Sequence, residues 1–282
     1  MTEQFADLHL HTVYSDGSFT PAEVVASARA LDLSAISIVD HDTIQGIPPA
    51  LAECRAAGIE FIPGIELSSN DSGGTVHILG YGIDWRDKVF CEFLEEMRKN
   101  RLERMEKIFK KFQALGVTLD LSEFLLAGQQ GTVGRLHLAH FLVGKGIVAD
   151  LAEAFERYIG DGKPAYLPVD MLNPREAVEM IRRACGVPVL AHPGITHRDE
   201  LIPRLVSWGL MGIEVYYSKH LPEAIQHYRK LAEKYGLLVL GGSDCHGAGG
   251  KGESLIGTVR LPYEYVEKLK VAIEERLTNG HH

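Results

Sequence analysis

The chain has 282 residues, 45% of them hydrophobic, and a formal net charge of -9, so it is long enough to bury a sizeable core. The acidic balance argues against a basic surface that would bind duplex nucleic acid. No apolar run approaches the roughly 20 residues of a membrane span and no signal region precedes the first expected strand, so we expect a cytoplasmic protein without a membrane partner. The sequence identifies no protein partner.

Short β-branched runs alternate with amphipathic helices along the chain, which is typical of a parallel α/β architecture. A threonine cap, a proline and a glutamate begin the first expected helix at 20–23, and Asn173-Pro174-Arg175-Glu176 begins a later one in the same way. Seven strands are expected and suggest a barrel; they lie at 5–9, 35–39, 61–65, 76–81, 188–191, 212–216 and 237–241.

The regular alternation breaks between about Trp85 and Cys185, where the sequence becomes helical and charged. We therefore expect residues 1–85 and 186–280 to form the barrel and residues 86–185 to form a helical insertion. Because the insertion leaves the fourth strand and rejoins at the fifth, it should overhang the carboxyl ends of the strands as a lid that selects substrate. The terminal His281 and His282 are interpreted as the remnant of an expression tag.

Histidines and carboxylates gather where the expected strands end. Side chains at i and i+2 of a strand share one face, so His9 with His11, and Asp244 with His246, can each hold one ion. A lone His-x-His is more often an ordinary strand or loop pair, but its recurrence after most of the strands favours a metal site at the mouth of the barrel. The full set is His9, His11, Asp16, His41, Glu66, His77, His192, Asp244 and His246.

At these residues the chain resembles the polymerase and histidinol phosphatase (PHP) family of the amidohydrolase superfamily. The matching segments are 7–12 with 15–17, 39–43, 63–66, 76–80, 191–193 and 243–247. The resemblance implies a distorted seven-stranded (β/α)7 barrel with a trinuclear centre of three divalent metal ions. Manganese is the expected metal, and the mixed nitrogen and oxygen ligands leave zinc and iron as alternatives.

The resemblance also implies how the ligands are shared. One ion would take His9, His11, Glu66 and Asp244; a second would share Glu66 and add His77 and His192; the third would take Asp16, His41 and His246. Two ions bridged by Glu66 would hold and deprotonate a water, and the third would neutralise phosphoryl oxygens, which suits phosphate ester hydrolysis. Glu66 and Asp244 are accordingly expected to be catalytic.

The insertion resembles a PHP subfamily whose members remove the 3'-phosphate from nucleoside 3',5'-bisphosphates or degrade short RNA, at 134–137, 154–158 and 162–166. Arg135 should begin a helix, where free amides and a guanidinium can hold a phosphate, unless it is an ordinary surface residue. His137 and His140 would line the lid or belong to its core. His197 would contact phosphate or protonate the leaving oxygen, or would be a solvated loop histidine.

The resulting hypothesis is a metal-dependent phosphoesterase that hydrolyses the 3'-phosphate of nucleoside 3',5'-bisphosphates, such as 3'-phosphoadenosine 5'-phosphate to AMP, by metal-activated hydroxide. A 5'-to-3' exoribonuclease acting on short RNA would use the same chemistry and remains an alternative. A non-catalytic, metal-dependent nucleotide-binding module is the alternative from a different class.

Overall fold

The computed structural model describes residues 3–127, 134–167, 172–248 and 254–279, so the terminal pair interpreted as a tag lies outside it. The chain groups into two compact units. The strand unit comprises Met1–Cys91 and Met171–His282, and the helical unit comprises Glu92–Asp170. The expected insertion was longer, at 86–185. Helix α7 (Pro174–Arg183) accounts for much of the difference, because it packs on strands of the strand unit.

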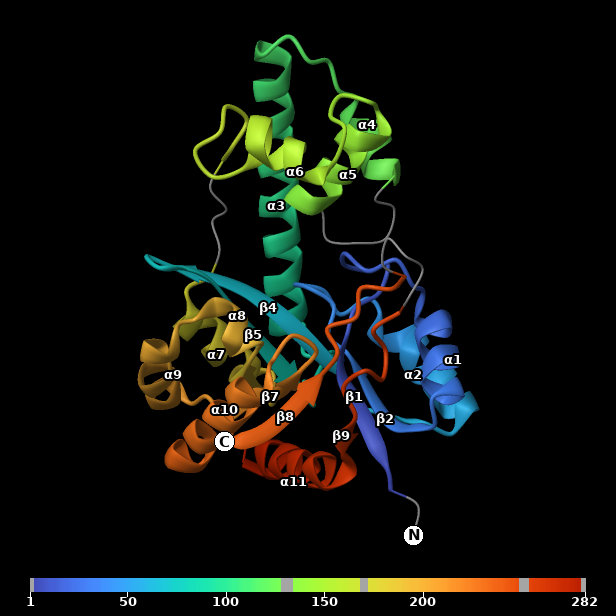
Figure 1. The fold of residues 1–282 in the computed structure, drawn as a ribbon, viewed down its shortest axis with the longest axis vertical. Helices are drawn as coiled ribbons and strands as arrows, with labels where there is room; N and C mark the ends of the chain where they lie inside the picture. Colours follow the sequence, from blue (N-terminus) through green and yellow to red (C-terminus); the bar gives the residue numbers. More distant parts are fainter. Residues whose placement is uncertain (1–2, 128–133, 168–171, 249–253, 280–282) are drawn as a thin grey trace. The chain divides into compact units, whose positions relative to one another are not determined.

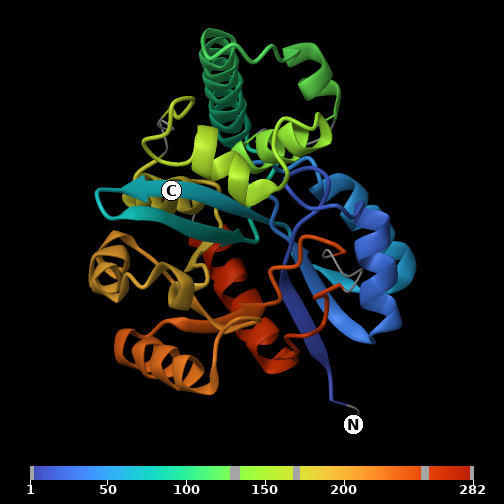
Figure 2. The ribbon, with the colours of Figure 1, turned by 45° about the horizontal axis from the view of Figure 1, so that its top comes forward.

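The strand unit contains two sheets, which Figures 1 and 2 show from two directions. One has the strand order β3-β2-β1-β9 and the other the order β4-β5-β6-β7-β8. The strands are β1 (Phe5–Leu10), β2 (Leu33–Ile38), β3 (Glu60–Phe61), β4 (Gly64–Asp71), β5 (Gly74–Tyr81), β6 (Val187–Leu190), β7 (Gly212–Tyr217), β8 (Leu238–Gly242) and β9 (Leu261–Pro262).

The sheets are mixed, whereas the sequence predicted a parallel architecture. Strands β1, β2 and β3 are parallel, as are β6, β7 and β8, but β5 runs antiparallel to both β4 and β6. Only two residues separate β4 from β5, and a turn that short joins antiparallel strands only. The strand expected at 61–65 is divided between β3 and β4. Pro63 lies at the division, because proline has no N–H to give to a ladder.

Two isolated bridges join the sheets, one between His41, which follows β2, and Glu66 of β4, and one between Leu10 of β1 and Cys245, which follows β8. At the second of these, which we call the β1–β8 seam, the His11 N–H donates to the Cys245 carbonyl (3.0 Å) and the Asp244 N–H donates to the His9 carbonyl (2.9 Å). These bonds bring the ends of strands from both sheets together. They do so at the residues that were expected to bind metal.

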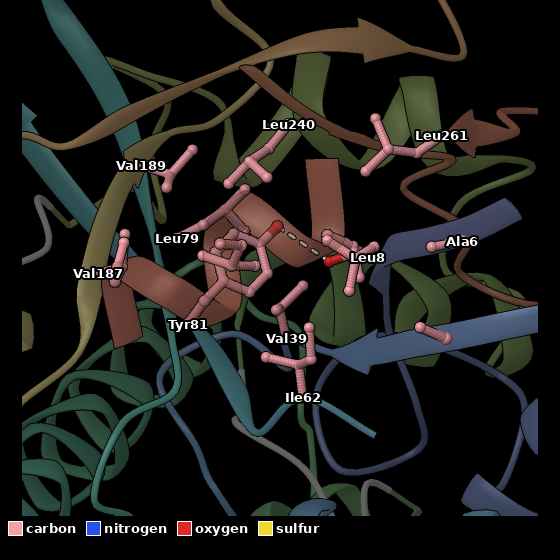
Figure 3. Packing of buried hydrophobic residues seen from close by; sticks show 14 of the residues in the cluster. Ala6, Leu8, Val39, Ile62, Leu79, Tyr81, Val187, Val189, Leu240 and Leu261 are labelled. Atoms are coloured by element: carbon pink, nitrogen blue, oxygen red, sulfur yellow. Dashed lines mark hydrogen bonds between the residues drawn. The ribbon is translucent and has the colours of Figure 1, made fainter. Parts of the chain in front are cut away.

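The core of the strand unit lies between the sheets and their helices, and Figure 3 shows part of it. Tyr81 is fully buried there, and its hydroxyl donates to the Leu8 carbonyl at 3.0 Å. Both expected capping boxes are confirmed, at Thr20 with Glu23 and at Asn173 with Glu176. The covering helices are α1 (Pro21–Ala30), α2 (Ile47–Ala57), α7, α8 (Pro193–Thr196), α9 (Ile202–Trp208), α10 (Pro222–Tyr235) and α11 (Tyr263–Asn279).

The helical unit has its own core, in which Phe112, Phe124 and Leu142 are buried. Its elements are α3 (Lys88–Ala114), whose first turn belongs to the strand unit, α4 (Leu121–Ala127), α5 (Arg135–Gly144), α6 (Leu151–Ala154) and a π-helical turn (Phe155–Ile159). Among the helices that the structure describes, none combines the length and the apolar character needed to cross a membrane.

Candidate metal centre

All nine residues predicted to bind metal lie in one cluster of the strand unit. Most lie at or just after the carboxyl end of a strand, but Glu66 and His77 lie in the first halves of β4 and β5. Because β5 runs antiparallel to β6, its first half meets the end of β6, where Ile78 pairs with Leu190. On the other side the register places His77 opposite Ser68 of β4, two residues from Glu66. The reversal of β5 therefore places a strand-interior histidine in the cluster.

Four donor atoms form the tightest group. The Nε2 atom of His9 lies 3.2 Å from His11 Nε2, 3.1 Å from Glu66 Oε2 and 3.4 Å from Asp244 Oδ1. The Nε2 atom of His11 lies 3.2 Å from each of those two carboxylate oxygens. A tetrahedral ion with ligands at about 2.0–2.1 Å would hold its donors about 3.3 Å apart. The four residues thus fit a metal ion, and they are the set expected for the first one.

The other oxygen of Glu66 faces a second group. Its Oε1 atom lies 2.8 Å from His77 Nδ1 and 3.1 Å from His192 Nε2. His77 Nδ1 is buried and makes no hydrogen bond with good geometry, even though Glu66 is so close. Such an arrangement is expected when two metal-ligand atoms point at a shared ion instead of at each other. Glu66 therefore stands between two groups of ligands, one at each carboxylate oxygen.

A third group surrounds Asp16. Its Oδ1 atom lies 3.2 Å from His246 Nε2 and 3.9 Å from His11 Nδ1, and its Oδ2 atom lies 3.8 Å from His41 Nε2. His11 was not expected in this group, but its two ring nitrogens face the first and third groups. His41 also lies between groups, because its Nδ1 atom is 3.5 Å from Glu66 Oε2.

The charges of the cluster depend on one another. Burial would raise the pKa of Glu66, but the positive charges of His41, His9 and His77 outweigh burial and hold that pKa well below its usual range. Burial would likewise lower the pKa of His11, but hydrogen bonds to Asp244 and Glu66 raise it to about 10. Metal ligands must be deprotonated, so an ion that enters this cluster has to displace protons from its histidines.

Two residues of the cluster have backbone angles in the left-handed region, namely Asp244 (φ 55°) and His192 (φ 25°). Residues other than glycine rarely adopt such angles, which cost about 1–3 kcal/mol and occur often at functional sites. Each of the two residues follows a strand, β8 and β6 respectively. The sharp turn of the backbone there directs the side chain into the cluster.

Several polar residues that the sequence analysis did not single out support this cluster. The Tyr217 hydroxyl donates to Asp244 Oδ2 at 2.9 Å, and Asp7 accepts the Ser243 N–H at 2.8 Å. Burial raises the pKa of Asp7 to about 6, against the lowering effect of its hydrogen bonds. Glu214 contacts both His9 and His192. The sequence could have pointed to it, because it is the one charged residue in the otherwise uncharged strand β7.

His197 follows the turn that carries His192. It ends helix α8 with a left-handed backbone (φ 51°), its side chain is exposed, and no hydrogen bond or ion pair of that side chain occurs within the described residues. The sequence left two interpretations of His197 open, and its exposed surroundings are those of a solvated loop histidine. A contact with substrate is still compatible with that exposure.

The remaining candidates belong to the helical unit. Arg135 begins helix α5 as expected, and its Nη1 atom donates to Asp161 at 2.5 Å. The neighbouring Arg104 has a pKa lowered to about 10, first by burial and then by the charge of Arg135. His137 and His140 lie outside the core and line a cavity of ≈ 390 Å³ between α4 and α5.

The fold and the cluster together define a class. Six histidines and three carboxylates gathered in one cluster of a mixed α/β fold are typical of a metal-dependent hydrolase. The model of the PHP domain matches residues 7–160. The chain belongs to the PHP family, and it is a phosphoesterase. The non-catalytic alternative is thereby set aside.

Relatives with different activities resemble the chain about equally. It is 33% identical to a 3',5'-nucleoside bisphosphate phosphatase of Chromobacterium violaceum over 91% of this chain and 92% of that protein. It is 32% identical to a 5'-3' exoribonuclease of Haemophilus influenzae over 87% of this chain and 91% of that protein. A crystal structure from Bifidobacterium adolescentis, described as a candidate metal-dependent phosphoesterase, matches with a TM-score of 0.84 and 29% identity, over 95% of this chain and 96% of that one.

Proposed function

We propose that the protein removes the 3'-phosphate of nucleoside 3',5'-bisphosphates. The observation that carries this proposal is that the two units of the chain supply different binding groups. The strand unit supplies a cluster that fits metal ions, and the helical unit supplies a guanidinium at the first residue of a helix, which suits a second phosphate. A substrate with phosphates at both ends of a ribose needs both features. The phosphatase of Chromobacterium violaceum, 33% identical, acts on such compounds.

The metal centre of this proposal holds three divalent ions, with manganese as the proposed metal and zinc or iron as alternatives. Described residues form three groups of donors that overlap at His11, His41 and Glu66. Bound ions would lower the pKa of a water molecule to near neutrality and would neutralise the phosphoryl oxygens. Glu66 would hold two positions together through its two oxygens, and Asp244 would complete the first. His197 would contact the phosphate or give a proton to the leaving oxygen.

Arg135 is proposed to bind the other phosphate. Its present partner, Asp161, has a largely exposed carboxylate, and a surface ion pair of this kind contributes about 0–1 kcal/mol. A phosphate dianion could therefore replace Asp161 at modest cost. Arg104, whose pKa is lowered first by burial and then by the charge of Arg135, adds a second cation to the same region. This residue was not predicted from the sequence.

The helical unit is further proposed to act as the lid that selects substrate, and the two sheets to act as one distorted barrel. The isolated bridges between the two sheets support the barrel. The lid is tested by replacing residues 92–170 with a flexible Gly-Ser linker. The shortened protein should still bind metal and should hydrolyse a small activated phosphate ester weakly, without preference for nucleotides. An unchanged preference for bisphosphates would remove the lid from the proposal.

A 5'-to-3' exoribonuclease is the second candidate, because the relative from Haemophilus influenzae is almost as similar as the phosphatase. The two activities differ in whether a nucleotide or a proton lies beyond the scissile phosphate. Incubation with manganese and either adenosine 3',5'-bisphosphate or a 5'-phosphorylated RNA trinucleotide separates them. We expect inorganic phosphate from the first substrate to form faster than mononucleotides from the second. The reverse order would favour the exoribonuclease.

A further inference from the structure

Strand β7 supplies none of the nine proposed metal ligands, although it lies between β6 and β8, which both lead into ligand-bearing turns. Its central residue Glu214 is nevertheless completely buried, with 0% of its surface exposed. A buried carboxylate is costly unless hydrogen-bond donors surround it. The hydrogen-bond donors around Glu214 therefore indicate the role of this residue.

Among the residues that the structure describes, one hydrogen-bond donor faces each oxygen of Glu214. Its Oε1 atom lies 2.8 Å from His9 Nδ1, and its Oε2 atom accepts the backbone N–H of His192 at 2.7 Å. Because an ionised carboxylate can only accept, the proton of the neutral His9 ring must be on Nδ1. The Nε2 atom is then left with a free lone pair, and it is this atom that faces Glu66, Asp244 and His11.

The two contacts of Glu214 lead to the same two groups of ligands that Glu66 joins. Glu66 faces His9 with one oxygen and His192 with the other. Glu214 does the same from the outer side, through the far nitrogen of the His9 ring and the backbone of His192. The two carboxylates thus enclose the pair of histidines, one from inside the cluster and one from behind it.

We propose that Glu214 is the positioning residue of the metal centre, which fixes the His9 ring with Nε2 toward the ion and joins the first and second metal positions from behind. This inference rests on the metal centre of the proposed function, but not on its substrate. Hydrogen bonds to the far nitrogen of a ligating histidine typically change metal affinity by about 10–100-fold. Because Glu214 contacts both groups, its loss should weaken both positions.

The decisive variant is Glu214→Gln. An amide keeps the size of the side chain but turns one acceptor into an NH2 group, so one of the two N–H donors must lose its partner. We expect the affinity for Zn²⁺ to fall about 10–100-fold at two positions per chain. The measurement is a titration of the metal-free protein against a zinc buffer, with bound metal counted by elemental analysis. The matched control is Tyr81→Phe, which removes a buried hydrogen bond of β5 that touches no ligand side chain and should leave the zinc affinity unchanged.

A second measurement uses the unaltered protein and does not depend on the folding of a variant. In the zinc-loaded protein labelled with ¹⁵N-histidine, NMR should show His9 with a proton on Nδ1 and none on Nε2. A His9 ring protonated on Nε2 would overturn the inference. So would a folded Glu214→Gln protein whose zinc affinity equals that of Tyr81→Phe, or one that loses zinc at a single position only.

These outcomes are separate from the choice of substrate. If the zinc and NMR results are as expected but adenosine 3',5'-bisphosphate is not hydrolysed, then the role of Glu214 stands and the proposed substrate is wrong. If the bisphosphate is hydrolysed at a normal rate and Glu214→Gln binds zinc normally, then the proposed function stands and Glu214 only packs the strand.

Discussion

Glu66 is the side chain on which the metal centre depends most. Its Oε2 atom lies within 3.2 Å of nitrogen atoms of both His9 and His11, and its Oε1 atom lies within 3.1 Å of His77 and His192 nitrogen atoms. One carboxylate thus provides negative charge to two groups of histidines. A change at this position should affect more of the centre than a change at a ligand that faces one group only.

We therefore expect Glu66→Gln to abolish turnover and to lower the metal content, because an amide carries no charge to share between two ions. Turnover is measured by phosphate release and metal by elemental analysis. Glu60→Gln is the control, since Glu60 pairs with Lys270 and takes no part in the cluster. Most of the activity remaining in Glu66→Gln, with full metal occupancy, would show that Glu66 is not a shared ligand.

For Arg135→Ala we expect the specificity for a nucleoside 3',5'-bisphosphate to fall about ten- to a hundredfold, because a charge-assisted contact contributes about 1.5–3 kcal/mol. A substrate without the second phosphate should be affected much less. Steady-state kinetics of both substrates give kcat/KM for each. Arg98→Ala is the control, because Arg98 is an exposed helical-unit arginine paired with Glu95. Equal losses on both substrates would mean that Arg135 supports the fold.

Residue identity and spacing were enough to predict which side chains gather, because histidines and carboxylates at strand ends have few other reasons to recur. They were not enough to predict which nitrogen faces which partner. His11 uses both ring nitrogens, and His41 lies between two groups. Such details depend on ring orientation, which is set by packing and by remote partners such as Glu214. Glu214 lies more than 200 residues from His9 in the sequence.

Among the strands, the β1–β8 seam is the contact that brings Asp244 to His9. The seam requires a glycine at position 242. A Cβ atom added to Gly242 would lie 2.3 Å from the backbone nitrogen of His9 and 2.3 Å from the Cβ atom of His9. Real Cβ atoms do not approach other atoms that closely. Strands β1 and β8 can therefore come this near only where one of them lacks a side chain.

We expect Gly242→Ala to force β8 away from β1, and so to lower both the melting temperature and the metal content. Overpacking of a buried site typically costs about 1–3 kcal/mol. The measurements are thermal unfolding and elemental analysis. The control is Gly144→Ala, where an added Cβ meets no atom within 4 Å. A Gly242→Ala protein with normal metal content would show that the seam tolerates separation.

The positions of the strands along the chain followed from the sequence better than the direction of each strand did. Alternating strands and helices predicted β1, β2, β6, β7 and β8, all of which are parallel to a neighbour. They could not show that β5 is reversed, because hydrophobic periodicity is the same in both directions. The two residues between β4 and β5 contained that information. The short turn Ser72-Gly73, followed by Gly74, would have predicted the hairpin.

The complete chain should respond to pH in a way that reveals whether metal is bound. In the metal-free protein the pKa of His11 is raised from 6.5 to about 10 and that of His9 is also raised. Between pH 6.5 and about 10 the folded state therefore binds more protons than the unfolded state. The contribution of these histidines to the free energy of unfolding is fully present below pH 6.5 and is lost as pH rises toward 10. Bound metal replaces those protons and should remove the effect.

We therefore expect the free energy of unfolding of the metal-free protein to fall from pH 7 to pH 9, and that of the metal-loaded protein to fall less. Urea unfolding with and without a chelator measures both. The range ends at 9, because burial raises the pKa of Cys54 to about 12 and its thiol would add a similar effect at higher pH. A metal-free protein with constant stability over this range would contradict the charge state assigned to His9 and His11.

The β1–β8 seam also has a consequence for the time at which the centre forms during synthesis. His9 and Asp244 are 235 residues apart (244 − 9 = 235), and ribosomes add about 5–20 residues per second, so roughly 10–50 s separate their appearance. Until β8 emerges, His9 and His11 lack their partner Asp244 and have no strand beside them at this edge. Metal should therefore be loaded after translation is nearly finished, and a nascent chain stalled before β8 would lack the Asp244 ligand and the seam.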